Sequence, residues 1–423
     1  MSQRAPPKAK HLRASDARAV VKLATQAVHG ITRVTEGVHQ SVWARLGVHN
    51  TSQPERTQGL TAWVYQAIHG LTFAVGRGLD AALARLQPRL ERLEGSAPGS
   101  PEREAVVAAL NGVMGDHLAS TDNPLATAMH LRWQGVPLWD EHHAVTINAQ
   151  QASPKVLLLI HGLCMNDLQW TTQHQGQVVN HGETLAETMG CTLLTLRYNS
   201  GLHISSNGHR LAALLEQLRT HWPVPLQEIH VLAHSMGGLV MRSSVFAATQ
   251  ASMQWPKQLQ TLVFLGTPHH GAPLERVGNR VDVILASTPH IAPFAHLAKL
   301  RSSGITDLRY GLLLDEDWAG RDRFRRSPDH RTALPLPEGV ACYAVAGTVA
   351  GAASKTRGLL AERLVGDGLV PLHSSLGFHE DPARCLHFAQ TATFTAYRTS
   401  HMALLSSPEV GAQLLKWLVP QHR

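Results

Sequence analysis

The chain has 423 residues, of which 43% are hydrophobic and only 16% charged, a composition typical of a globular protein with two or three domains. Residues 1–100 hold 13 Lys and Arg against 6 Asp and Glu, while the rest holds 25 of each, so the net charge of +7 is N-terminal. A body without net charge argues against a nucleic-acid-binding catalytic domain, because phosphate contacts need clustered Lys and Arg. The basic N-terminal part can still contact an anionic surface.

Features that would place the chain in a membrane or outside the cell are not visible in the sequence. No stretch of 18 apolar residues occurs, and the first 30 residues lack the apolar core of a secretory signal. The four cysteines are far apart, which is typical of reduced thiols. The 27 histidines are scattered without metal-ligand spacing. We therefore expect a cytoplasmic protein with no metal and no cofactor, and peripheral contact with a membrane or lipid surface stays open.

The N-terminal region has a different pattern from the rest. Residues 1–15 are rich in Pro, Lys and Arg and predict a disordered basic tail. Within residues 16–95, apolar positions recur at steps of three and four, first from Val20 and again from Val64, which predicts a helical hairpin. We expect the apolar faces of this hairpin to form a core or docking surface rather than to insert into a membrane. The stretch GSAPGSP at residues 95–101 reads as a linker.

Beyond the linker, residues 102–423 alternate between short apolar runs and amphipathic segments, after a first helix at 102–118. This alternation predicts a mainly parallel sheet with helices on both faces, and active sites then lie at the carboxyl ends of the strands. The predicted strands are 145–147, 156–160, 192–196, 229–232, 262–265 and 340–346, with helices at 208–218 and 237–248.

The stretch EIHVLAHSMGGLV, residues 228–240, has the pattern of a strand, a tight turn and a helix. Small residues at Ala233 and Gly237 allow the strand and helix backbones to pass close to a strained turn. Ser235 would then project at the edge of the sheet, with its oxygen at a helix N-terminus that favours negative charge. We predict that Ser235 is a nucleophile; a serine in an ordinary turn is the alternative.

The strand at 155–160 ends in His161-Gly162-Leu163. Acyl transfer needs two donors aimed at the developing oxyanion, one from the residue after the nucleophile and one from the loop after an earlier strand. The N–H groups of Met236 and Leu163 fit these two roles, and Gly162 lets the loop turn tightly.

An acid and a base are expected downstream, in that order. Asp367 lies between glycines in VGDGLVP, residues 365–371, although a plain Gly-Asp-Gly turn is an alternative. His401 in SHMALL precedes an apolar helical run near the C-terminus. We predict Asp367 as the acid and His401 as the base. The rivals for the base, which lie before the final helix and nearer a predicted strand at 385–389, are His373, His379 and His387.

Five motifs, LLLIHGL, VLAHSMGG, LGTPHHGAP, GDGLVP and SHMALL, together resemble the bacterial lipase and PGAP1-like esterase branch of the α/β-hydrolase superfamily. The resemblance covers about residues 145–418 and implies an α/β-hydrolase fold. One departure is Ala233 in place of the more usual first glycine of the elbow motif. The resemblance assigns the catalytic roles to Ser235, Asp367 and His401 and the oxyanion donors to Leu163 and Met236.

The stretch GTPHHG, residues 266–271, matches one that helps to shape the site in this family. Metal binding by the adjacent His269 and His270 is disfavoured, because no third and fourth ligand is visible. Residues 274–337 form a long insertion that we expect to cap the site, with a purely structural excursion as the alternative. The residues expected to bind substrate are His161, Gly162, His234, Thr267, Pro268 and His269.

The sequence thus predicts a serine carboxylic-ester hydrolase of lipase or esterase type, acting in lipid metabolism without a cofactor through an acyl-enzyme on Ser235. The same residues would also serve a polyester depolymerase or an acyltransferase. A non-catalytic hydrolase-fold binding protein is a further alternative. The sequence predicts neither the acyl-chain length nor the oligomeric state.

Overall fold

The computed structural model describes residues 16, 18–19, 100–140, 144–272, 301–323, 325, 328–351 and 366–419. The predicted tail at 1–15, nearly all of the hairpin at 16–95 and the first part of the predicted cap lie outside these residues. The chain divides into two compact units, residues 1–103 with 120–125, and residues 104–119 with 126–423. In the first unit Arg103 Nε donates to Asp16 Oδ2 at 2.8 Å. The second unit holds all the predicted site residues.

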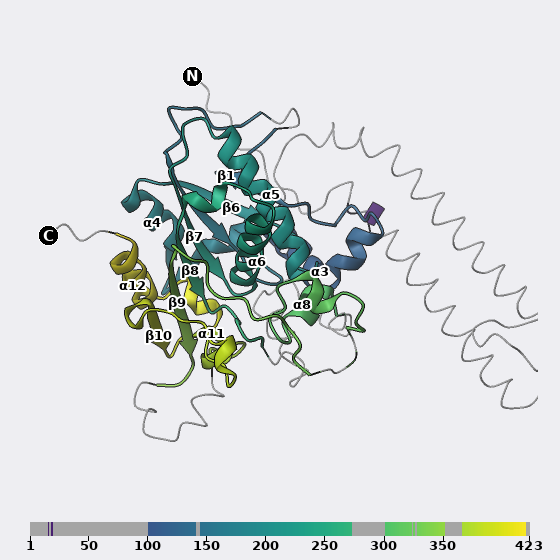
Figure 1. Ribbon diagram of the computed structural model, residues 1–423. Coiled ribbons are helices and arrows are strands. Elements are labelled where there is room, and N and C mark those ends of the chain that lie inside the picture. Colours follow the sequence, from purple (N-terminus) through teal and green to yellow (C-terminus); the bar gives the residue numbers. More distant parts are fainter. Residues whose placement is uncertain are drawn as a thin grey trace, which may run out of the picture. The chain divides into compact units, whose positions relative to one another are not determined.

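An eight-stranded sheet organises the second unit, in the order β10-β9-β8-β7-β3-β6-β1-β2 (Figure 1). Pairing is parallel from β10 to β6 and antiparallel from β6 through β1 to β2. This is the mainly parallel sheet of an α/β-hydrolase fold, and the predicted fold class is confirmed. The strands are β1 (His130–Trp133), β2 (Val136–Pro137), β3 (Lys155–Ile160), β6 (Thr192–Arg197), β7 (Glu228–His234), β8 (Leu259–Leu265), β9 (Ala341–Thr348) and β10 (Thr393–Tyr397), with a separate hairpin of β4 (Thr172–His174) and β5 (Gln177–Val179).

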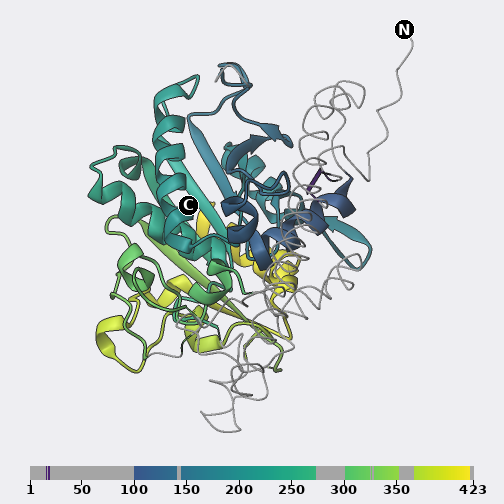
Figure 2. The ribbon, with the colours of Figure 1, turned by 90° about the vertical axis from the view of Figure 1, so that its right-hand side faces the viewer.

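Helices cover both faces of the sheet, because its central strands are apolar on both sides. Side chains of β3 alternate between two cores, with Val156, Leu158 and Ile160 in one and Leu157 and Leu159 in the other. The first core lies under α5 and α6, and the second under α4 and α12 (Figure 1, and Figure 2 after a quarter turn). The helices of eight or more residues are α3 (Pro101–Ser120), α4 (His181–Met189), α5 (Ile204–His221), α6 (Met236–Gln250) and α12 (Pro408–Leu418).

Shorter helical turns connect these elements. Two of them, α8 and α9, lie in the described part of the insertion between β8 and β9, and the proposed capping role of this insertion stays a prediction. None of the helices in the described ranges is both long and apolar enough to cross a bilayer. The short turns are α8 (Ser303–Asp307), α9 (Asp315–Trp318), α11 (Leu372–Ser375), and the 3-10 turns η1 (Asp167–Trp170), η2 (Trp255–Gln258), η5 (Pro382–Arg384), η6 (Gln390–Ala392) and η7 (Met402–Leu405).

Two predicted strands are wrong. Val145 forms only an isolated bridge with Trp139 and does not join the sheet. Residues 385–389 follow η5 as an irregular segment, and Leu386 N–H donates to Gly377 O at 2.9 Å instead of pairing with a strand. The segment still packs against the core, since Phe388 lies edge-on to Phe264. The strand that pairs with β9 at the edge of the sheet is β10. The other predicted strands and helices of this unit are present with bounds shifted by a few residues.

Candidate active site

The turn between β7 and α6 consists of a single residue, Ser235. Its backbone has φ 55° and ψ −125°, a region that side-chain-bearing residues rarely adopt and that costs of order 1–3 kcal/mol. Two hydrogen bonds hold this conformation: Ser235 N–H donates to Leu265 O at 2.8 Å, and Gly238 N–H donates to Ser235 O at 3.1 Å. The predicted elbow context of Ser235 is therefore present.

The two glycines after the elbow are required by close backbone approach. A Cβ on Gly237 would lie 2.5 Å from the carbonyl oxygen of Ile160 and 2.7 Å from that of His161. A Cβ on Gly238 would overlap the hydroxyl of Thr267. The first turn of α6 therefore rests directly on the ends of β3 and β8, which fixes the position of Ser235.

Asp367 and His401 form a buried pair. His401 Nδ1–H donates to Asp367 Oδ2 at 2.6 Å, and His401 N–H donates to the Asp367 backbone oxygen at 3.0 Å. The other carboxylate oxygen, Oδ1, accepts from the N–H groups of Leu369 at 3.0 Å and Val370 at 2.8 Å. With both oxygens engaged, the carboxylate is held in one orientation and fixes the imidazole ring through Nδ1.

The sheet brings the three predicted catalytic residues to one edge, where Ser235 and His401 line a cavity and Asp367 lies behind His401 as its hydrogen-bond partner. Ser235 follows β7, Asp367 lies in the loop after β9 and His401 follows β10, so all three stand beyond the carboxyl ends of parallel strands. Ser235 and His401 line the same cavity without a direct side-chain hydrogen bond between them. Such a contact is often long before substrate binds. Other lining residues are Leu163, Met165, His234, Pro268, Ala272, Leu308, Leu369, Val370 and Met402.

Two backbone donors sit beside Ser235. Met236 is the first residue of α6, and Leu163 follows the end of β3 in the cavity wall. Among the described residues, neither N–H group donates a hydrogen bond to another protein atom, although both residues are buried. Buried N–H groups are almost always paired, so these two are available to an oxygen in the cavity.

His234 lies against His401, with the ring centroids 4.6 Å apart. Its Nε2–H donates to the His401 carbonyl oxygen at 3.2 Å, which leaves Nδ1 buried without a partner in the described structure. Burial, followed by the neighbouring His401 charge, holds the pKa of His234 well below its ordinary value. His234 is therefore a neutral ring that holds the backbone of His401.

Only some of the predicted substrate-binding residues line the cavity of Ser235. His234 and Pro268 line the cavity, and a Cβ on Gly162 would lie 3.0 Å from the Cβ of Ser235. His161 is buried behind the cavity and stacks on Tyr198 with ring centroids 4.3 Å apart. Thr267 and His269 are also buried and are not among the described lining residues.

His269 packs edge-on against Phe264 at 4.6 Å. In the described part of the chain, no group of three or more His, Cys, Asp or Glu side chains is arranged to hold a metal ion. Of the rival bases, His373 lies in the short helix α11, His379 lies against Asp329 at 3.9 Å and His387 is exposed. The imidazole hydrogen-bonded to Asp367 Oδ2 is that of His401.

Several cavity residues were not predicted from the sequence. Met165, Leu369, Val370 and Met402 directly follow predicted site residues by one to three positions, so their motifs carried a signal that they were near the site. Leu308 comes from the insertion, and no local pattern in the sequence marks it as a site residue.

Comparisons with known proteins give one family-model match and several remotely similar structures. Residues 151–333 match the family model described as PGAP1-like alpha/beta domain. No curated protein matches the chain significantly. Solved structures that are similar include Bacillus licheniformis lipase BlEst2 in mature form, at 16% identity over 69% of this chain and 98% of that chain with a TM-score of 0.40.

Two further similar structures are EstA from Clostridium botulinum and an esterase from Pyrococcus furiosus. EstA has 13% identity over 68% of this chain and 92% of its own, with a TM-score of 0.34. The Pyrococcus esterase has 15% identity over 63% of this chain and 83% of its own, also with a TM-score of 0.34.

Proposed function

We propose that this chain, whose residues 151–333 carry a PGAP1-like alpha/beta domain, is a serine hydrolase of carboxylic esters. The observation that supports the proposal most strongly is the buried pair of Asp367 and His401, which opens onto the cavity that Ser235 lines from a strained turn. A protein that only binds a ligand has no need of a fixed imidazole beside a strained serine, since both are costly to maintain.

In the proposed reaction, Ser235 Oγ attacks the ester carbonyl carbon while its proton passes to His401 Nε2. Asp367 holds the imidazolium through Nδ1–H and stabilises its charge. The carbonyl oxygen becomes an oxyanion, which can accept hydrogen bonds from the N–H groups of Leu163 and Met236, since neither donates to another described protein atom. The tetrahedral intermediate collapses as the alcohol leaves with the proton from His401. Water then attacks the acyl-enzyme by the same steps in reverse order and releases the acid.

The cavity at Ser235 is small, about 20 Å³, and its wall is mostly apolar, which favours an ester with an apolar acyl part next to the serine. The same catalytic groups would serve a polyester depolymerase, or an acyltransferase if an alcohol replaced water in the second step. A series of p-nitrophenyl esters of increasing acyl length, assayed below and above the solubility of each, shows which acyl length the enzyme prefers and whether it acts at an interface. Activation at the solubility limit would identify a lipase.

The catalytic assignment is tested by substitution. We expect Ser235→Ala and His401→Ala each to lower turnover of a p-nitrophenyl ester by about 10³ to 10⁶-fold, and the double variant to be little worse than either single variant. His387→Ala is the control, because His387 is exposed and makes no contact with Asp367. A serine-directed phosphonate should label the wild type and not Ser235→Ala. Near-normal turnover by His401→Ala would exclude His401 as the base.

A further inference from the structure

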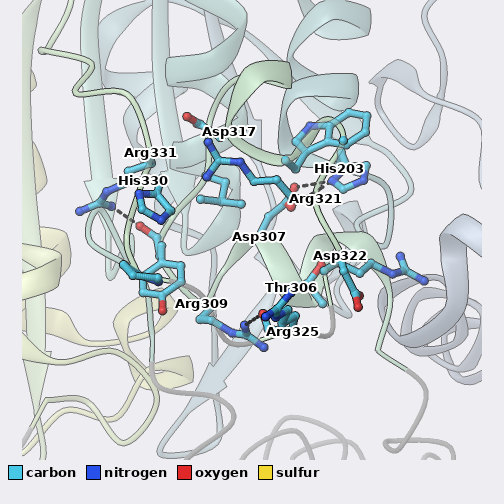
Figure 3. Close-up of a pocket in the computed structure, with 16 residues that line it drawn as sticks. His203, Thr306, Asp307, Arg309, Asp317, Arg321, Asp322, Arg325, His330 and Arg331 are labelled. Atoms are coloured by element: carbon cyan, nitrogen blue, oxygen red, sulfur yellow. Dashed lines mark hydrogen bonds and ion pairs between the residues drawn. The ribbon is translucent and has the colours of Figure 1, made fainter.

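A second cavity, with a volume of about 350 Å³, lies in the insertion between β8 and β9 (Figure 3). Its walls come from α8, α9 and the segment up to residue 331, together with His203 at the start of α5. The volume is within the range of sites that hold small organic molecules and is far more than a single inorganic ion needs. None of the predicted catalytic residues lines it.

The lining of this second cavity is strongly basic, with five arginines against three aspartates. The two buried aspartates are occupied by internal partners. Asp317 Oδ2 accepts from the N–H groups of Leu313 and Leu314, both at 3.0 Å. Asp307 accepts from Ile204 N–H at 2.8 Å and is hydrogen-bonded to His203 Nδ1 at 3.0 Å. These hydrogen bonds fix the two carboxylates in position, and Asp317 still acts electrostatically on Arg331.

The arginines fall into two groups. Three have protein partners: Arg331 is buried, donates to the carbonyl oxygens of His269 and Tyr310 and pairs with Asp329, Arg323 is paired with Asp116, and Arg309 donates to the backbone oxygen of Arg325. By contrast, the side chains of Arg321 and Arg325 make no hydrogen bond or ion pair with a described residue. Figure 3 shows Arg321 on the upper side of the second cavity and Arg325 on the lower side. Two exposed arginine side chains with no hydrogen-bond or ion-pair partner among the described residues therefore line one cavity.

The remaining wall is partly aromatic and apolar. Trp318 stacks on His203 with ring centroids 3.7 Å apart and an angle of 5° between the planes, and its Nε1–H donates to Ser205 Oγ at 2.9 Å. These contacts hold the indole rigidly. Tyr310 and Leu312 line the same space. A ligand that fits this wall has an apolar or carbon-based part in addition to its negative charge.

We propose that this second cavity binds a small organic phosphate, whose phosphate group is held by Arg321 and Arg325. Guanidinium forks match phosphate oxygens in geometry and charge, and each such hydrogen bond is charge-assisted. The phosphate can belong to a soluble metabolite or to the headgroup of a lipid, since both present the same group. The proposal does not depend on the esterase activity, because no catalytic residue takes part.

The second cavity and the catalytic cavity share one short stretch of chain, residues 307–309. Asp307 and Arg309 line the second cavity, whereas Leu308 between them lines the cavity of Ser235. The Leu308 carbonyl oxygen accepts from Ala272 N–H at 2.8 Å, which attaches this turn to the loop after β8. One short segment therefore separates the two sites.

The test is calorimetric titration of the full chain with two probes, glycerol 3-phosphate and a short-chain phosphatidic acid kept below its micelle concentration. We expect at least one probe to bind, and Arg321→Ala/Arg325→Ala to weaken its affinity tenfold or more. Arg210→Ala is the matched control, because Arg210 is an exposed arginine on α5 outside the cavity. Binding of glycerol 3-phosphate indicates a soluble ligand, and binding of the lipid alone indicates a headgroup.

Two results would overturn the proposal. One is that neither probe binds the wild type at millimolar concentration. The other is that the double variant, with an unchanged melting temperature, binds as tightly as the wild type. Arg321→Lys/Arg325→Lys separates charge from geometry, and we expect it to recover only part of the affinity because lysine cannot form the bidentate pair.

Discussion

Asp367→Asn is the most direct test of the arrangement around His401. The amide can keep its oxygen on the N–H groups of Leu369 and Val370, which the carboxylate Oδ1 accepts at 3.0 and 2.8 Å. Its NH₂ group then replaces Oδ2 opposite His401 Nδ1, where the observed distance is 2.6 Å. Since an NH₂ group donates, Nδ1 must accept, and the ring proton moves to Nε2. His401 in that tautomer cannot take a proton from Ser235.

The expected loss of turnover is about 10⁴-fold, which corresponds to about 5 kcal/mol of transition-state stabilisation. Stability should change little, because the two backbone donors keep an acceptor. The assay is steady-state hydrolysis of a soluble p-nitrophenyl ester, with urea unfolding as the check on the fold. Asp381→Asn is the control, since Asp381 is exposed, caps the η5 turn and pairs with Arg384, and makes no contact with His401. Turnover by folded Asp367→Asn within tenfold of wild type would refute the assignment of Asp367 as the acid.

Two further predictions concern stability. Gly237→Ala should lower the free energy of unfolding in urea by about 1–3 kcal/mol, because its Cβ would lie 2.5 Å from Ile160 O. Gly351→Ala is the control: the nearest described atom to its Cβ would be 3.5 Å away, so the change should stay within about 0.5 kcal/mol. Equal urea midpoints for the two variants would contradict the packing argument. Burial lowers the pKa of His161 from 6.5 to about 4, so the folded chain binds fewer protons between these values. The stability from this group should be complete above about pH 6.5 and fall by about 3 kcal/mol towards pH 4. His161→Gln should flatten the dependence of the urea midpoint on pH, and an unchanged slope would refute this origin.

The sequence alone determined the parallel sheet and the order of the motifs. A fully buried strand needs an unbroken apolar run, and KVLLLI of β3 has one that local inspection reveals. The elbow was equally visible, because only small residues fit where α6 meets the end of β3, as the 2.5 Å approach at Gly237 shows. Asp367 was predicted from a glycine-flanked carboxylate after a predicted strand, and His401 from its position before an apolar helical run near the C-terminus.

The pairing of these motifs was decided by the tertiary structure. Asp367 and His401 are 34 residues apart, and they meet because β9 and β10 are parallel neighbours whose following loops lie at one edge. Tertiary pairing also explains why the predicted strand at 385–389 does not form. Its apolar residues would suit a strand, but β10 takes the edge position beside β9.

The contribution of the insertion to both cavities was also invisible in the sequence. Leu308 and Arg309 are adjacent in the chain, yet one lines the cavity of Ser235 and the other the arginine-rich second cavity. Their directions depend on where the turn after α8 is attached, through Ala272 and through the pairing of Asp307 with His203. Local patterns report the type of each element, because they depend on near neighbours. Which side chains share a cavity depends on contacts between residues far apart in the chain, and those exist only in the folded protein.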